Sequence, residues 1–211
     1  MTIVLSIVAL ILAYLMGSFP SAFIVAKLSQ GVDIRRVGSR NMGAMNTFYK
    51  VGFWWGMLVL ILDIGKGALA AAVGWQMTHM DYIQLAAGFA AVLGHSFPIF
   101  LRFKGGKGGA TCIGALLYIM PWGGPFLLAL FGIVLLITRF PTLSYGVALL
   151  GFPVIAAVLY KDHNPAYIIY SVVLFIMPFV RYIPRVAEMK RGAGGGGWKH
   201  VLMRRNLKDR L

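Results

Sequence analysis

Residues 95–113 read HSFPIFLRFKGGKGGATCI and place a glycine-rich loop directly between two membrane-length apolar segments. Four glycines fall within the five positions 105–109, so the backbone can approach a bound ion closely. Lys104 and Lys107 add positive charge, and the helix that follows offers its unpaired N-terminal amides. The pattern predicts an anion site at a membrane surface, with a phosphate as the anion.

The composition places the rest of the chain in a membrane as well. Of its 211 residues, 59% are hydrophobic and 12% are charged, and the mean hydropathy is +0.79. These values lie far from those of soluble proteins, so we expect an all-α integral membrane protein. Apolar length, interrupted by charges, Pro or Gly, gives seven candidate transmembrane helices. They cover residues 3–26, 53–77, 82–101, 108–120, 122–138, 143–160 and 166–180.

The fourth and the first of these candidate spans differ from an ordinary internal span. The fourth is short for a hydrocarbon layer of about 30 Å, so it would be tilted, partly re-entrant or extended into the glycine-rich loop. Six spans are therefore an alternative to seven. The first should stay in the mature chain, because Met1–Ile3 carries no basic side chain and no small-residue cleavage site ends the run.

The positive charges orient the chain, because Lys and Arg near the ends of spans stay on the cytoplasmic side. With the N-terminus outside and the C-terminus cytoplasmic, every Lys and Arg lies inside except Lys66, within a span, and Lys161. The basic side chains behind the net charge of +14 therefore lie on the cytoplasmic side, where they can attract anionic lipids and anionic cytoplasmic substrates. We expect membrane lipids as partners and no nucleic acid.

Neither a disulfide nor a metal site is expected. Cys112 is the only cysteine, and it should behave as a small apolar residue. The four histidines are scattered and no Cys/His spacing or paired carboxylates accompany them. We therefore predict no protein-only metal site and no cofactor. One transmembrane domain should cover residues 1–180, with a basic cytoplasmic tail over residues 181–211.

A second loop on the same side is rich in polar groups. Residues 38–46 read GSRNMGAMN, with a hydroxyl, a guanidinium and two amides between small residues. The ordinary interpretation is a turn that caps the next helix, since Ser and Asn do both. A ligand site is an equally good interpretation, and this segment alone does not separate the two.

Two polar groups also lie inside predicted spans. Residues 17–22 read GSFPSA, for which close helix packing and a proline kink are the favoured interpretation, although Ser21 could reach a polar site. Asp63 and Lys66 stand three residues apart on one helical face and can neutralise each other. An intramembrane charge pair suggests function, yet this pair can satisfy itself, so we favour a structural role.

Four blocks together resemble the acyl-phosphate-dependent glycerol-3-phosphate acyltransferases of bacterial membranes. The blocks are GSFPSA, GSRNMGAMN, DIGKG at residues 63–67, and the segment from Gly94 to Thr111. The resemblance extends from around residue 10 to residue 145, and the glycine-rich loop is its most specific part. It implies seven helices in the bacterial inner membrane, with acyl transfer from acyl phosphate to glycerol 3-phosphate. The product would be lysophosphatidate, an intermediate of phospholipid biosynthesis.

The resemblance also implies a set of site residues. The phosphate of glycerol 3-phosphate would bind Lys104, Gly105, Gly106, Lys107 and Gly108, and the catalytic set would be Ser39, Asn41 and Asn46. Ser39 and Asn41 are our candidates for hydrogen bonds to the carbonyl or the leaving phosphate, with charge from Arg40 or Lys50. We expect His95 to support the glycine-rich loop rather than act as a base. Because phosphate is a good leaving group, we predict no acyl-enzyme intermediate.

The chain departs from the family pattern at four places. Arg40 replaces a usual Gly, and Tyr49 followed by Lys50 replaces an Arg, which a flexible lysine does not match in geometry. In the tail, Tyr182 and Arg185 stand where the family has His and Asn. Two alternatives therefore stay open: a diverged paralogue with another acceptor or no turnover, and a transporter of a phosphorylated solute. Against transport, we find no internal repeat of the kind many transporters have.

Overall fold

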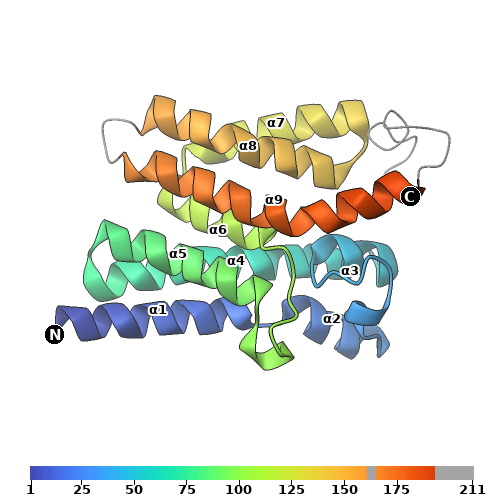
Figure 1. Cartoon of the computed structure of the whole chain (residues 1–211), viewed down its shortest axis with the longest axis horizontal. Helices are drawn as coiled ribbons and strands as arrows, with labels where there is room; N and C mark the ends of the chain where they lie inside the picture. The colour runs from blue at the N-terminus through green and yellow to red at the C-terminus, as the bar shows by residue number, and fades with distance from the viewer. Residues whose placement is uncertain (161–164, 193–211) are drawn as a thin grey trace. The chain divides into compact units, whose positions relative to one another are not determined.

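The computed structural model describes residues 1–160 and 165–192, and every regular element within them is a helix (Figure 1). The chain forms two compact units, Met1–Pro121 and Trp122–Leu211. The all-α class expected from the composition is thus confirmed.

The first unit contains eight of the described helices, two of them short 3-10 helices labelled η. Their bounds are α1 Thr2–Ser18, α2 Ser21–Gln30, η1 Ile34–Arg36, α3 Ala44–Lys50, α4 Phe53–Thr78, α5 Asp81–Ser96, η2 Ile99–Leu101 and α6 Gly109–Ile119. The second unit contains α7 Gly123–Thr138, α8 Pro141–Leu159 and α9 Ala166–Gly192.

Apolar helices lie at all seven predicted segments, and five segments among the described residues are long and apolar enough to cross a membrane. These five are Thr2–Gln30, Phe53–Thr78, Asp81–Leu101, Pro141–Leu159 and Ala166–Pro184. The other two, α6 and α7, are shorter apolar helices. The 11 residues of α6 rise by about 16 Å, half of the hydrocarbon thickness. The fourth predicted segment is therefore short, as expected.

Small residues bring the long helices of the first unit into close contact. Helix α1 packs against α5 and α4, and α4 also packs against α5 and α6 (Figure 1). A Cβ atom added at Gly67 would overlap the Thr111 carbonyl oxygen, and one added at Gly114 would overlap that of Ile64. Such close backbone approach is how helices associate within a bilayer. It fixes α6, and with it the glycine-rich loop, against α4.

Large apolar side chains cover the outer faces of these helices. Ile7 and Ile11 of α1 and Ile61 and Leu69 of α4 are each more than half exposed. Contact with lipid chains in a membrane is favourable for such apolar faces, whereas contact with water is unfavourable.

The second unit is a bundle of three helices. Helix α8 packs against both α7 and α9. Gly123 at the start of α7 leaves room for the ring of Phe152, and the Trp122 amide donates to the Tyr160 hydroxyl at 3.0 Å. Helix α9 continues through residue 180, the domain boundary expected from sequence, to Gly192. That boundary stays a prediction.

Candidate active site

The first membrane segment breaks at Phe19 and Pro20, between α1 and α2. Pro20 has no amide hydrogen and its ring clashes with a preceding turn, so the helix ends before it. The Phe19 amide still donates to the Met16 carbonyl at 3.2 Å, and a new helix begins at Ser21. The kink predicted from this proline is thus a complete break.

Two buried charges on α4 lie against this break. Asp63 and Lys66 are only 1% and 8% exposed, and Lys66 Nζ lies 2.8 Å from Asp63 Oδ1. Lys66 also donates to the Phe19 carbonyl at 3.0 Å, while the Ser21 hydroxyl donates to Asp63 Oδ1. The cation thus meets the C-terminal end of α1 and the anion meets the N-terminal end of α2, which matches both helix dipoles. The pair stabilises the break as well as itself.

His95 connects this charged pair to the glycine-rich loop. It lies in the last turn of α5 and is 7% exposed. Its Nδ1 lies 3.5 Å from Asp63 Oδ1. On the other side of the ring, a Cβ atom at Gly106 would come closer than 3.0 Å to Nε2. The imidazole is therefore held between α4 and the loop.

The glycine-rich loop runs over His95 before it enters α6. The Gly106 amide donates to the His95 carbonyl at 3.1 Å, and a Cβ atom at Gly105 would overlap the same carbonyl oxygen. Gly108 has φ 87°, in the left-handed region that favours glycine, and directly precedes the first turn of α6. The N-terminal amides of this helix point out of its end and provide donors for an anion. Lys104 is exposed and Lys107 is half-buried.

The turn that leads into this loop has an unusual backbone. Arg102 and Phe103 have φ of 52° and 60°, so two successive residues other than glycine occupy the left-handed region. The Leu101 and Phe103 amides both donate to the Pro98 carbonyl, at 3.1 and 2.9 Å. Such backbone strain persists only where surrounding contacts fix it, and it is common near functional sites.

Asn46 organises the second polar loop. Its Nδ2 donates to the carbonyls of Ile34, Val37 and Asn41 at 3.0, 3.0 and 3.1 Å, and its Oδ1 accepts from the Ser39 amide at 3.0 Å. The side chain is 1% exposed. Both the oxygen and the nitrogen of its side-chain amide thus form hydrogen bonds with the backbone of the loop.

The other predicted residues of this loop are more accessible. Ser39 and Asn41 are half-buried, whereas Arg40 and Lys50 are exposed, Lys50 at the end of α3. Arg40 has φ 56°, in the left-handed region. The position where the resembling family carries glycine therefore keeps a glycine-like backbone, which explains that preference.

A second contact steadies the start of this loop. Arg35 bonds both oxygens of Asp33, at 3.0 and 2.9 Å, and its guanidinium lies 4.8 Å from the centre of the Phe23 ring. The hydrogen bond from Arg35 lowers the pKa of Asp33 from 3.8 to about 2. Because this pKa is depressed, the stabilisation is present above 3.8 and is lost as the pH falls through 2.

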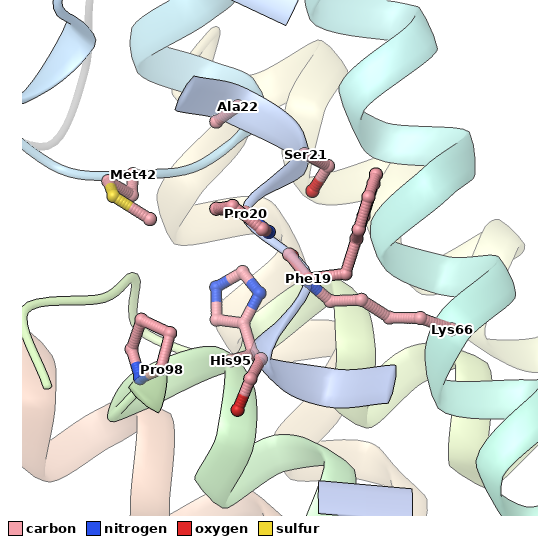
Figure 2. Close-up of a pocket in the computed structure, with 9 residues that line it drawn as sticks. Phe19, Pro20, Ser21, Ala22, Met42, Lys66, His95 and Pro98 are labelled. Atoms are coloured by element: carbon pink, nitrogen blue, oxygen red, sulfur yellow. The ribbon is translucent and has the colours of Figure 1, made fainter. Parts of the chain in front are cut away.

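The two loops meet at Gly106. A Cβ atom there would come closer than 3.0 Å to the Met42 carbonyl oxygen as well as to His95. Figure 2 shows Met42, Pro98 and His95 around a small pocket beside the helix break. The pocket is lined by Ser18, Phe19, Pro20, Ser21, Ala22, Met42, Lys66, His95 and Pro98. Three segments far apart in sequence thus converge on the glycine-rich loop.

The sequence favoured a structural role for Asp63 and Lys66 and left open that Ser21 could reach a polar site, and the structure brings all three to the site through His95. The available signal was the intramembrane charge pair together with a serine directly after a proline. In the second unit, Tyr182 is half-buried in α9. The side chain of Arg185 and the predicted linker and tail from residue 193 onward lie outside the described residues.

Comparison with known proteins places these features in a family. The family model described as "Glycerol-3-phosphate acyltransferase" matches residues 7–192. "Glycerol-3-phosphate acyltransferase 2" of Dehalococcoides mccartyi (strain ATCC BAA-2266 / KCTC 15142 / 195) is 47% identical over 100% of this chain and 99% of its own length. "Glycerol-3-phosphate acyltransferase" of Bacillus subtilis (strain 168) is 50% identical over 64% of this chain and 69% of its own.

Solved structures are similar too. The crystal structure of PlsY (YgiH), an integral membrane glycerol 3-phosphate acyltransferase, in its glycerol 3-phosphate form, matches with a TM-score of 0.81 and 29% identity. The match covers 89% of this chain and 92% of that one. The lysophosphatidic acid form of the same protein matches with a TM-score of 0.76.

Proposed function

Because the chain belongs to the glycerol-3-phosphate acyltransferase family, we propose that it transfers an acyl chain to a hydroxyl group of glycerol 3-phosphate. The product is lysophosphatidate, which enters phospholipid biosynthesis. The donor we propose is acyl phosphate. The sequence blocks that resemble acyl-phosphate-dependent enzymes support this choice.

The convergence at Gly106 is the observation that carries the proposal. There the glycine-rich loop, the end of α5 and the second polar loop approach so closely that a side chain does not fit. A loop held in this way presents its amides, the N-terminus of α6 and two lysines to one bound anion. We assign the phosphate of glycerol 3-phosphate to Lys104, Gly105, Gly106, Lys107 and Gly108.

The second polar loop supplies the groups for the acyl donor. Ser39 and Asn41 are half-buried and can donate to the carbonyl oxygen or the phosphate of the donor. Arg40 and Lys50 are exposed and add positive charge for the phosphate. We assign Asn46 to holding this loop, in place of the catalytic role predicted for it, because its amide is occupied by backbone groups.

The reaction is then a direct transfer. An oxygen of glycerol attacks the acyl carbonyl carbon, the bond between this carbon and the phosphate oxygen breaks, and inorganic phosphate leaves with the electron pair. The departing phosphate can accept the proton of the glycerol hydroxyl. The enzyme contributes position and charge, and no covalent acyl-enzyme forms. His95 supports the loop in this scheme.

We further propose seven membrane spans, with the N-terminus outside and the C-terminus in the cytoplasm of a bacterial cell. The five long apolar helices, the two shorter ones and the distribution of Lys and Arg support this topology. The inner membrane follows as the location. Both loops of the site then face the cytoplasm, where glycerol 3-phosphate is available.

Turnover by the purified protein in lipid tests the proposal. Acyl phosphate and glycerol 3-phosphate should give lysophosphatidate, and acyl-CoA with the same acceptor should give none. The absence of lysophosphatidate from both donors would refute acyl transfer. Uptake of labelled glycerol 3-phosphate into proteoliposomes without any acyl donor would favour a transporter instead.

A further inference from the structure

Asp63 and the glycine-rich loop face the two different ring nitrogens of His95. Asp63 Oδ1 lies 3.5 Å from Nδ1, and Gly106 packs against Nε2. Asp63 therefore does not need to touch the substrate to affect it, because only one imidazole ring separates the carboxylate from the loop.

We infer that Asp63 is a positioning residue for the phosphate-binding loop and acts through His95; this role rests on the acyltransferase function proposed above. A carboxylate beside Nδ1 favours the tautomer that carries its proton on Nδ1. The carboxylate thereby holds the ring in the orientation that places Nε2 against Gly106. A rotated ring would push Gly106 away, because the two lie so close that a Cβ atom at Gly106 would come within 3.0 Å of Nε2.

The carboxylate is itself fixed from other directions. The Ser21 hydroxyl and Lys66 Nζ both donate to Oδ1, the same oxygen that faces His95. Lys66 carries the charge that balances Asp63. Since Lys66 is also bound to the Phe19 carbonyl, the position of the ring is tied to the helix break. Figure 2 shows Ser21, Lys66 and His95 around this break.

This role predicts a specific kinetic effect. If the ring moves, the amides of residues 105–108 lose their alignment toward the phosphate of glycerol 3-phosphate, while the groups that we assign to the acyl donor stay in place. The KM for glycerol 3-phosphate should therefore rise and the KM for acyl phosphate should not. A purely structural role for Asp63 would lower the amount of active protein and leave both KM values unchanged.

The test is the double variant Asp63→Asn/Lys66→Met in the purified full-length enzyme, which removes both charges together and leaves no unpaired buried ion. We expect the KM for glycerol 3-phosphate to rise about tenfold, with the KM for acyl phosphate within about twofold of wild type. Unchanged KM values for both substrates, or equal increases in both, would overturn the inference.

A milder variant keeps the test decisive if the double variant does not fold. Ser21→Ala removes one donor to Asp63. Ser29→Ala is its matched control, because the Ser29 hydroxyl donates to the Val25 carbonyl of its own helix at 2.7 Å. A higher KM for glycerol 3-phosphate in Ser21→Ala alone would support the inference. The same KM in both variants would overturn it.

Two further measurements distinguish a failure of the positioning role from a failure of the proposed acyltransferase function. In a His95→Phe background, the Asp63→Asn/Lys66→Met change should add nothing to the KM for glycerol 3-phosphate, and independent effects would show that Asp63 does not act through His95. Calorimetric binding of glycerol 3-phosphate covers the case in which wild type makes no product. If wild type then binds glycerol 3-phosphate and the double variant binds it more weakly, acyl transfer alone is refuted. If product forms and the KM for glycerol 3-phosphate is unchanged in the double variant, only the positioning role is refuted.

Discussion

Gly106 has room for a hydrogen atom and nothing larger. We predict that Gly106→Ala raises the KM for glycerol 3-phosphate by tenfold or more, because the new methyl group must displace either His95 or the Met42 carbonyl. Steady-state kinetics on purified protein measures this effect. Gly65→Ala on α4 is the matched control, since a Cβ atom there has no neighbour within 4 Å, and it should behave as wild type. Equal KM values in both variants would contradict the close contact.

Asn46 and Asn41 should separate stability from catalysis. Asn46→Asp replaces a donor that faces three carbonyls with an acceptor, so we expect it to lower the free energy of unfolding by roughly 2–4 kcal/mol. Asn41→Ala should keep the wild-type melting temperature and lower kcat. Thermal unfolding in detergent and turnover distinguish the two. An Asn46→Asp protein with normal melting and no activity would return Asn46 to the catalytic set.

At this scale the sequence indicates residue types better than residue roles. The polar loop and the glycines were predicted as a site, but which of two asparagines is buried depends on how residues 34–46 fold back on one another. The same holds for Asp63, whose neighbours Ser21 and His95 are 42 and 32 positions away in the chain. Contacts of that range are set by helix packing.

Helix α6 connects the packing of the membrane helices to the phosphate site, since the loop enters its first turn. We predict that Gly114→Ala lowers the free energy of unfolding by about 1–3 kcal/mol, because its methyl group would overlap the backbone of Ile64 on α4. Gly132→Ala on α7, which has open space, is the control. Thermal unfolding of both variants in the same detergent measures the difference. A destabilisation in Gly132→Ala as large as in Gly114→Ala would show that the α4–α6 contact is not the cause.

The positions of the helices could be predicted well from the lengths of the apolar segments, because a chain crosses a membrane as continuous apolar helices. The seven predicted segments all contain helices, and the shortness of the fourth is confirmed. The break at Phe19 was expected only as a kink, since a proline alone does not tell which side chains will lie against the freed helix ends. Here Lys66 donates to the Phe19 carbonyl at the end of α1, and the Ser21 hydroxyl connects the start of α2 to Asp63.

For the whole molecule, the proposed topology predicts which loops are reachable from outside the cell. Cys112 is buried, so the natural chain offers a low background for thiol labelling. In intact cells, Met80→Cys between α4 and α5 should react with a membrane-impermeant maleimide, whereas Lys50→Cys should react only after the membrane is opened. Labelling of Lys50→Cys in intact cells would reverse the orientation and remove the site from the cytoplasm.

The most direct measurement is the KM for glycerol 3-phosphate of wild type and of Lys104→Ala/Lys107→Ala, with acyl phosphate saturating. The two lysines provide the charge of the phosphate loop, and loss of charged hydrogen bonds of about 1.5–3 kcal/mol predicts an increase of tenfold or more. Lysophosphatidate should still form at high glycerol 3-phosphate. A variant whose KM equals that of wild type would contradict phosphate binding at this loop.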